Sequence, residues 1–233
     1  MTAQTGVYVN QSGSWVKVVE KDLVLEFNTD LGDTTIEMPL DGTVDCTVDW
    51  GDGTRNNYTT TGTKSHTYAS GGTYTVRVSG LLTNFGGNSP TIRPELTRCL
   101  SFGEVGLTSL QYAFMICDNL VSVPKYLPQS SKITDIRHIF HNVPSFNQDL
   151  NEWDVSEVVD FGLAFAETSQ FNGNIKSWDT SNAEYMDLMF FNASSFNQDL
   201  SGWCVKNISN KPASFDEGAT AWTKPRPVWG TCP

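Results

Sequence analysis

The sequence has no apolar stretch approaching the roughly 18 residues that a helix needs to cross a bilayer. Residues 1–15, MTAQTGVYVNQSGSW, contain neither a basic segment nor an apolar segment, so no signal peptide is visible. Met1 suggests a complete reading frame. We therefore expect no membrane among the partners of this chain.

Basic residues are scarce. The 15 Lys and Arg stand against 26 Asp and Glu, which gives a formal net charge of −11. This balance argues against nucleic acid and anionic membranes as partners, because both repel an acidic protein. The charge also has a simpler interpretation, a solvated exterior that keeps the protein soluble.

The short motifs of common active sites are missing as well. The chain has no GxSxG elbow, no HExxH pattern and no glycine loop that would cradle a phosphate. Its aspartates recur by repetition, so no paired acid and base can be singled out. We expect no catalytic residues, no enzymatic activity and no cofactor.

Metal-ligand patterns are weak. His138 and His141 stand three residues apart on a predicted helical turn, which would make half of a metal site without a third ligand. Asp45, Asp49 and Asp52 lie near a glycine turn, where they predict either calcium binding or hydrogen bonds to the turn backbone. Because the EF-hand spacing is absent, we favour the second interpretation and expect no metal.

Aromatic residues, in contrast, reach 12% of the chain, and they repeat. Three tryptophans recur every 25 residues: Trp153, Trp178 and Trp203. A series of phenylalanines recurs at intervals of 26, 25, 25 and 25 residues: Phe114, Phe140, Phe165, Phe190 and Phe215. Such a period indicates a solenoid, in which each unit buries its apolar side against its neighbours. A solenoid offers a long surface for binding and rarely a deep catalytic pocket.

Within one repeat, two patterns alternate. Apolar residues in 158–165 and in 185–190 fall near helical spacing, whereas 149–153 is short enough for a strand. We expect each unit to pair one strand with one short helix. One asparagine per repeat predicts a buried ladder that hydrogen-bonds turn backbone from unit to unit: Asn147, Asn172 and Asn197.

The N-terminal third has β patterns. Residues 1–21 predict a hairpin around a turn at 11–14. Alternation at 44–50 and at 74–78, with turn signals every 8 to 12 residues, predicts a small β-sandwich over 22–80. The strings VDWGDGT (48–54), SHTY (65–68) and GTYTV (72–76) resemble a PKD domain, a family of spacers and binding modules on extracellular surfaces.

A second resemblance covers 81–233. The strings FNQDLNEWDVS (146–156) and FNQDLSGW (196–203), the connection NASS (192–195) and the final PVWGTCP (227–233) resemble the BspA-like leucine-rich repeat surface proteins. The resemblance implies a leucine-rich-type α/β solenoid of about five 25-residue repeats. The first repeats lack the FNQDL string, and Lys211-Pro212 interrupts the last one.

The five cysteines match no CxxC pattern. Cys204 replaces the aspartate of the repeat's SWD position and Cys232 lies in the terminal cap. We expect a disulfide between them that protects the open edge of the solenoid, with free thiols as the alternative. Cys46 is predicted as a small packed hydrophobe, and Cys99 and Cys117 could pair.

The expected fold is therefore β-rich and multidomain, with an α/β solenoid after a β-sandwich. The segments are a hairpin arm (1–21), the PKD-like sandwich (22–80), a linker and N-cap (81–104), the repeats (105–220) and a C-terminal cap (221–233). Ligand contact is predicted beside the buried tryptophans, where equivalent positions vary on a fixed frame: Asp149, Asn151, Glu152, Asn174, Lys176, Ser177, Asp199 and Ser201. The alternative interpretation is that these side chains are exposed to solvent and vary without any role in binding.

These features predict a non-enzymatic bacteriophage virion surface protein, a capsid decoration or a fibre that adheres to a host glycan or protein. Such a protein needs no export signal. The arm, which resembles short hairpins of phage tail and capsid proteins, would attach to other virion proteins through Tyr8, Asn10 and Trp15. Many copies, or a homo-oligomer, would make the adhesion multivalent. The alternatives are a secreted or cell-surface bacterial adhesin and a purely architectural cement protein.

Overall fold

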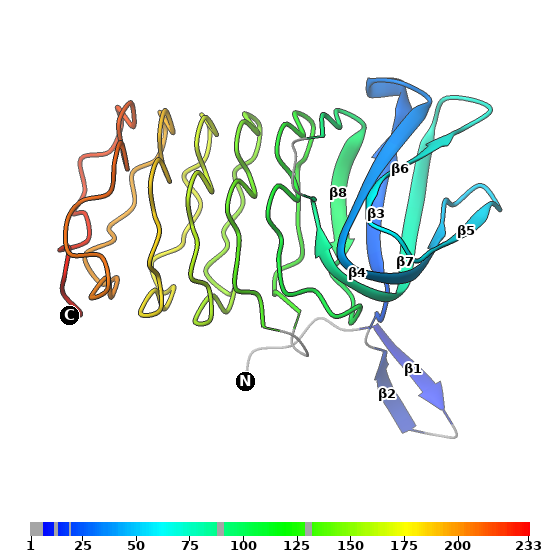
Figure 1. Ribbon diagram of the computed structural model, residues 1–233, viewed down its shortest axis with the longest axis horizontal. Helices are drawn as coiled ribbons and strands as arrows, with labels where there is room; N and C mark the ends of the chain where they lie inside the picture. The colour runs from blue at the N-terminus through cyan, green and yellow to red at the C-terminus, as the bar shows by residue number, and fades with distance from the viewer. Residues whose placement is uncertain (1–6, 12–13, 19, 88–90, 129–131) are drawn as a thin grey trace.

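The computed structural model describes residues 7–11, 14–18, 20–87, 91–128 and 132–233, with side chains from residue 20 onward. A hairpin comes first, a six-stranded sheet follows, and the rest of the chain runs away from the sheet in successive turns (Figure 1). In the hairpin, β1 (Val7–Gln11) pairs antiparallel with β2 (Ser14–Val18), so that Tyr8 lies opposite Lys17 and Asn10 opposite Trp15.

The larger sheet is antiparallel and has the order β5-β4-β7-β3-β8, with β6 also paired to β4. Alternating burial along β7 follows the period-two pattern of its sequence, which turns one face towards the core. The strands are β3 (Leu23–Asn28), β4 (Thr35–Asp49), β5 (Arg55–Tyr58), β6 (Gly62–Thr67), β7 (Thr73–Phe85) and β8 (Leu96–Ser101).

The expected two-sheet sandwich is wrong, because these strands form one open sheet. The first half of β4 pairs with β6 and its second half pairs with β5, while β7 lies along its other side. A register shift at Asp41–Val44, beside Gly42 with φ 68°, bends this 15-residue strand. Period-two burial shows that one face of a strand is covered, but it does not tell whether strands form one sheet or two.

The expected linker at 81–104 belongs to the sheet. β7 crosses the expected boundary at residue 80, and β8 lies within the linker range and pairs with β3. Two parallel bridges then join the sheet to the following chain, Asn84 with Ser109 and Arg98 with Ser122. The sheet and the turns beyond it are therefore continuous.

Beyond β8, successive turns of chain stack on one another (Figure 1), and we call each turn a coil. Parallel bridges at intervals of 26, 25 and 25 residues link Ser109, Asp135, Asp160 and Tyr185. Main-chain bonds repeat the interval: Phe140 donates to Ala164 O at 2.9 Å, and Phe165 donates to Met189 O at 2.9 Å.

The α/β repeat expected for these coils is wrong. Within the described residues the only helix is the short 3₁₀ turn η1 (Thr29–Leu31), and 149–153 is not a strand. The segment expected to be helical is a chain of tight turns, because Leu163 and Glu167 have left-handed φ of 54° and 58°. Their N–H groups donate to Asp187 O and Phe191 O of the next coil, at 2.9 and 2.7 Å, which offsets the steric cost of about 1–2 kcal/mol per residue. The described part of the chain contains no helix with the length and apolarity to span a membrane.

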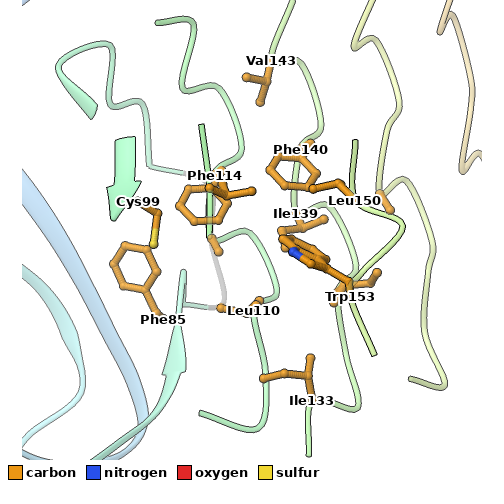
Figure 2. Packing of buried hydrophobic residues seen from close by; sticks show 14 of the residues in the cluster. Phe85, Cys99, Leu110, Phe114, Ile133, Ile139, Phe140, Val143, Leu150 and Trp153 are labelled. Carbon is orange, nitrogen blue, oxygen red and sulfur yellow. The ribbon is translucent and has the colours of Figure 1, made fainter. Parts of the chain in front are cut away.

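One hydrophobic core runs through the sheet and all the coils. Phenylalanine rings stack from coil to coil: the ring centroids of Phe114 and Phe140 are 5.7 Å apart (Figure 2). Those of Phe140 and Phe165 are 5.6 Å apart. The buried indoles are also satisfied, since Trp178 Nε1 donates to Leu150 O at 2.8 Å and Trp203 Nε1 donates to Ile175 O at 3.1 Å. Aromatic rings therefore shield one another along the stack.

Arg93 covers the N-terminal end of the stack. Its fully buried guanidinium donates to Ala113 O at 2.6 Å and lies 5.3 Å from the ring centre of Phe85. In the next coil the equivalent carbonyl, that of Ile139, accepts the N–H of Phe114 instead. Arg93 thus replaces the coil that is missing before the first one, and burial lowers the pKa of its guanidinium.

Candidate ligand-binding surface

The eight predicted ligand positions lie in three successive coils. In each of the three they occupy the tight turn just before the buried tryptophan. This turn repeats along the stack, so the positions form three neighbouring rows. Five of the side chains are exposed and three are half-buried: Asp149, Glu152, Lys176, Ser177 and Ser201 in the first group, and Asn151, Asn174 and Asp199 in the second.

Several of these side chains hold neighbouring coils together. Asp149 Oδ1 accepts the N–H of Asn174 at 2.7 Å. Asn151 Oδ1 accepts the N–H of Ser177 at 2.9 Å, and the Ser177 hydroxyl donates to Asn151 O at 3.0 Å. These residues hold neighbouring coils together, so only their remaining polar atoms are left for other contacts.

Others stabilise the turn of their own coil. Asn174 Oδ1 accepts the N–H of Lys176 at 3.2 Å, and Asp199 Oδ1 accepts both the N–H and the hydroxyl of Ser201. The Ser201 bonds, and then the charge of Lys176, lower the pKa of Asp199. Its carboxylate is therefore ionised at neutral pH.

The long charged side chains extend from this frame. Glu152 lies 4.0 Å from Lys125, and both are more than half exposed, so the pair contributes little to stability. Lys176 is exposed one coil further on. The surface thus alternates acidic, basic and hydroxyl groups on a regular backbone, a pattern suited to reversible polar binding.

The asparagine ladder beside this surface is present. Asn147 Oδ1 accepts the N–H of Asn172 and Asn172 Oδ1 accepts the N–H of Asn197, both at 2.9 Å. Asn197 Oδ1 accepts the N–H of Thr223 at 3.0 Å, which extends the ladder into the cap. The expectation that the ladder is buried is wrong, because Asn147 and Asn172 are exposed. Hydrogen bonding between coils, and not burial, requires asparagine here.

Two cysteines form a disulfide, and the other three are free thiols. Cys204 and Cys232 form the predicted disulfide. Cys46, Cys99 and Cys117 are buried free thiols, so Cys99 and Cys117 do not pair. Burial raises the pKa of Cys117 to about 11, which keeps it an unreactive thiol at neutral pH.

The acidic glycine turn after β4 is satisfied by protein groups. Asp49 Oδ1 accepts the N–H of Gly51 at 3.0 Å, and its other oxygen accepts from Arg55 Nε at 2.9 Å. Asp52 Oδ1 accepts the N–H of Thr54, while its Oδ2 lies 2.7 Å from His66 Nε2. Across the ranges that the structure covers, no group of three or more histidine, cysteine or acidic side chains could hold a metal ion.

Tyr8, Asn10 and Trp15, the predicted attachment residues, occupy paired positions of the hairpin. Their side chains lie outside the described residues. For these three positions the structure therefore gives the strand register alone.

Two surface features have no counterpart in the sequence argument. Tyr185 is 53% exposed on the bridged row of the coils. A hollow of about 580 Å³ near the start of β4 is lined by threonines and by Asp33, Glu37 and Glu95, but Glu95 Oε1 is bonded to the N–H of Asp33 at 2.8 Å. The 25-residue register could have placed Tyr185 on its row, whereas the hollow depends on contacts far apart in sequence.

Comparison with known proteins gives one family. Residues 108–229, more than half of the chain, match the family described as "Mycoplasma protein of unknown function, DUF285". Searches of curated proteins and of solved structures found no significant match. The expected identity, a BspA-like leucine-rich repeat surface protein with a PKD-like domain, is wrong, because the matching family is a different one and the N-terminal strands form an open antiparallel sheet. The chain belongs to the DUF285 family.

Proposed function

We propose that this chain is a non-enzymatic surface protein whose stacked coils, an array of about five 25-residue repeats, adhere to a glycan or protein on a host cell. The observation that most supports this proposal is a row of side chains just before the tryptophans. These side chains vary from coil to coil but stand on one shared backbone frame. At one position of this frame the residues are Glu152, Ser177 and Gly202. Variation of the outward groups on a repeated backbone frame is how repeat proteins adapt to a partner.

The proposal places the protein on a bacteriophage virion. The hairpin supports this placement, because β1 and β2 form a sheet of their own among the described strands. An arm of this kind has its outer edges available for pairing with another chain. In the proposal the arm binds other virion proteins, the six-stranded sheet is the base of the coils, and many copies on one particle raise the avidity.

The experiment compares two charge-matched double variants. E152S/K176S introduces a residue that the same frame already carries at Ser177 and Ser201, and it removes one acid and one base from the proposed surface. K132S/E157S removes one acid and one base from an ion pair elsewhere on the coils, with its atoms 3.4 Å apart. We expect only E152S/K176S to lower adsorption of particles to host cells and binding to an array of host glycans.

Equal adsorption of both variants and of the unchanged protein would exclude a receptor-binding role for this surface. The architectural alternative, a cement protein without a receptor, would then explain the hairpin without any adhesion by the coils. Electron microscopy of particles would test placement separately, because an arm that lies in no virion contact contradicts the virion assignment and leaves adhesion open.

A second candidate is a bacterial cell-surface adhesin. The family description, which refers to Mycoplasma, favours it, since it links related chains to a bacterial cell. Antibody labelling distinguishes the two: signal on intact, uninfected cells supports the adhesin, and signal confined to particles supports the virion protein.

A further inference from the structure

A line of titratable side chains crosses the outside of the first three coils. Tyr112 stacks on His138 with ring centroids 4.6 Å apart, and His138 stacks on His141 at 5.1 Å. His141 Nε2 lies 3.8 Å from Glu167 Oε2 of the next coil. Four side chains from three coils are thus in contact along one line.

The two histidines share one hydrogen bond. Their Nδ1 atoms are 2.9 Å apart. Because a neutral imidazole donates from one nitrogen and accepts at the other, the contact needs one ring with a hydrogen on Nδ1 and one without. When both rings are protonated, both Nδ1 atoms are donors and two like charges face each other. The contact is therefore compatible with the neutral pair and incompatible with the doubly charged one.

The later coils show that the fold does not need histidine here. One coil further on, Leu163 and Ala166 occupy the positions of His138 and His141. Leu163 has φ 54° and His138 has φ 57°, and the N–H of each donates to the following coil at 2.9 Å. Apolar side chains are thus compatible with the same backbone conformation and the same main-chain hydrogen bond. The backbone therefore does not require the histidine pair, whose effect comes from the imidazole groups themselves.

We propose that the His138–His141 pair is an acid-sensitive latch across the first three coils, closed while the rings are neutral and opened when both are protonated. Three other groups act on it. Arg137 opposes the protonation of His138, Glu167 favours that of His141, and Tyr112 of the preceding coil stacks on one face of His138. When the two rings separate, water reaches the main-chain hydrogen bonds that the pair covers.

The pKa shifts agree with this geometry. Burial, then the charges of His141 and Arg137, lower the pKa of His138 to about 4, and burial lowers the pKa of His141 against the effect of Glu167. A histidine whose pKa is lower in the folded state stabilises the fold fully above its ordinary pKa of about 6.5. That stability is lost as the pH falls from about 6.5 towards 4, so the latch opens in this range.

The test compares the protein with H138L/H141A, which carries the pair of the following coil. Amide hydrogen exchange would be followed by NMR at Ile116 and Asn142, which donate to His141 O and Ala166 O, with Asn192 as a reference in a later coil. Between pH 7 and 4.5 we expect protection at Ile116 and Asn142 to fall relative to Asn192, on the order of tenfold to a hundredfold. In H138L/H141A the ratio should not change.

A second measurement uses the unchanged protein alone. Titration of the imidazole nitrogens by NMR should show one Nδ1–H in the pair at neutral pH and a midpoint for His138 near 4. A midpoint at the ordinary value of about 6.5 overturns the latch, as does an equal loss of protection in both proteins. This titration decides the matter even where H138L/H141A does not fold.

Discussion

At the scale of single residues, Gly173 shows how closely two coils approach. A Cβ atom at this position would lie 2.1 Å from Gln148 O and 2.8 Å from the attached carbon, both backbone atoms of the preceding coil. Backbone cannot rotate away as a side chain does. The close approach of the two backbones at this point therefore leaves no room for a side chain at 173.

Gly173→Ala should destabilise the protein by about 1–3 kcal/mol, the usual cost of overpacking a close contact. Gly202→Ala is the matched control, because a Cβ there would meet nothing within 4 Å. It should change stability by less than about 0.5 kcal/mol. Urea unfolding of both variants measures the difference, and equal midpoints would contradict the packing described for Gly173.

At the scale of elements, the last coil is closed by the segment 223–233. Leu200 donates to Pro225 O at 3.0 Å, Val205 donates to Thr231 O at 2.8 Å, and the Cys204–Cys232 disulfide joins the same two stretches. Arg226 lies over the ring of Trp222 at 4.4 Å. The covalent bond adds to these contacts and limits how far the cap can open.

Replacing both Cys204 and Cys232 with alanine should lower the free energy of unfolding by about 2–4 kcal/mol, because the 28-residue separation is a long loop to close without the bond. Loss of exchange protection should concentrate at the amides of Leu200 and Val205. A control in which the buried thiol of Cys46 becomes alanine should leave those two amides protected. A uniform loss over all coils would contradict a local role for the disulfide.

Predictability from sequence also differs by element. The 25-residue register placed Asn147, Asn172 and Asn197 in one hydrogen-bonded ladder, because repetition fixes which residues stack. The same register did not reveal the turns at Leu163 and Glu167, since apolar residues spaced three or four apart fit a helix as well as consecutive turns. The bonds to the next coil that stabilise these turns are tertiary, and no local propensity contains them.

At the scale of the whole molecule, the sheet and the coils share one core. Phe85 of β7 lies 6.1 Å from Phe114 of the first coil, and Cys99 of β8 lies beside them (Figure 2). Arg93 binds a carbonyl of that coil. The pattern of the sequence divided the chain into a sandwich, a linker and repeats because composition changes near residue 80, but composition does not show which side chains meet across such a boundary.

This shared core predicts that the coils do not fold without the sheet. A fragment of residues 105–233 would leave Ala113 O without Arg93 and the ring of Phe114 without Phe85, so that a buried carbonyl and an aromatic face would meet water. A fragment of residues 20–233, which loses only the hairpin, keeps both contacts and is the control. We expect cooperative thermal unfolding, with coincident tryptophan fluorescence and circular dichroism transitions, from the control alone. Because the coils contain Trp153, Trp178 and Trp203, fluorescence reports on them directly, and a cooperative transition of 105–233 at the temperature of the control would contradict the dependence of the coils on the sheet.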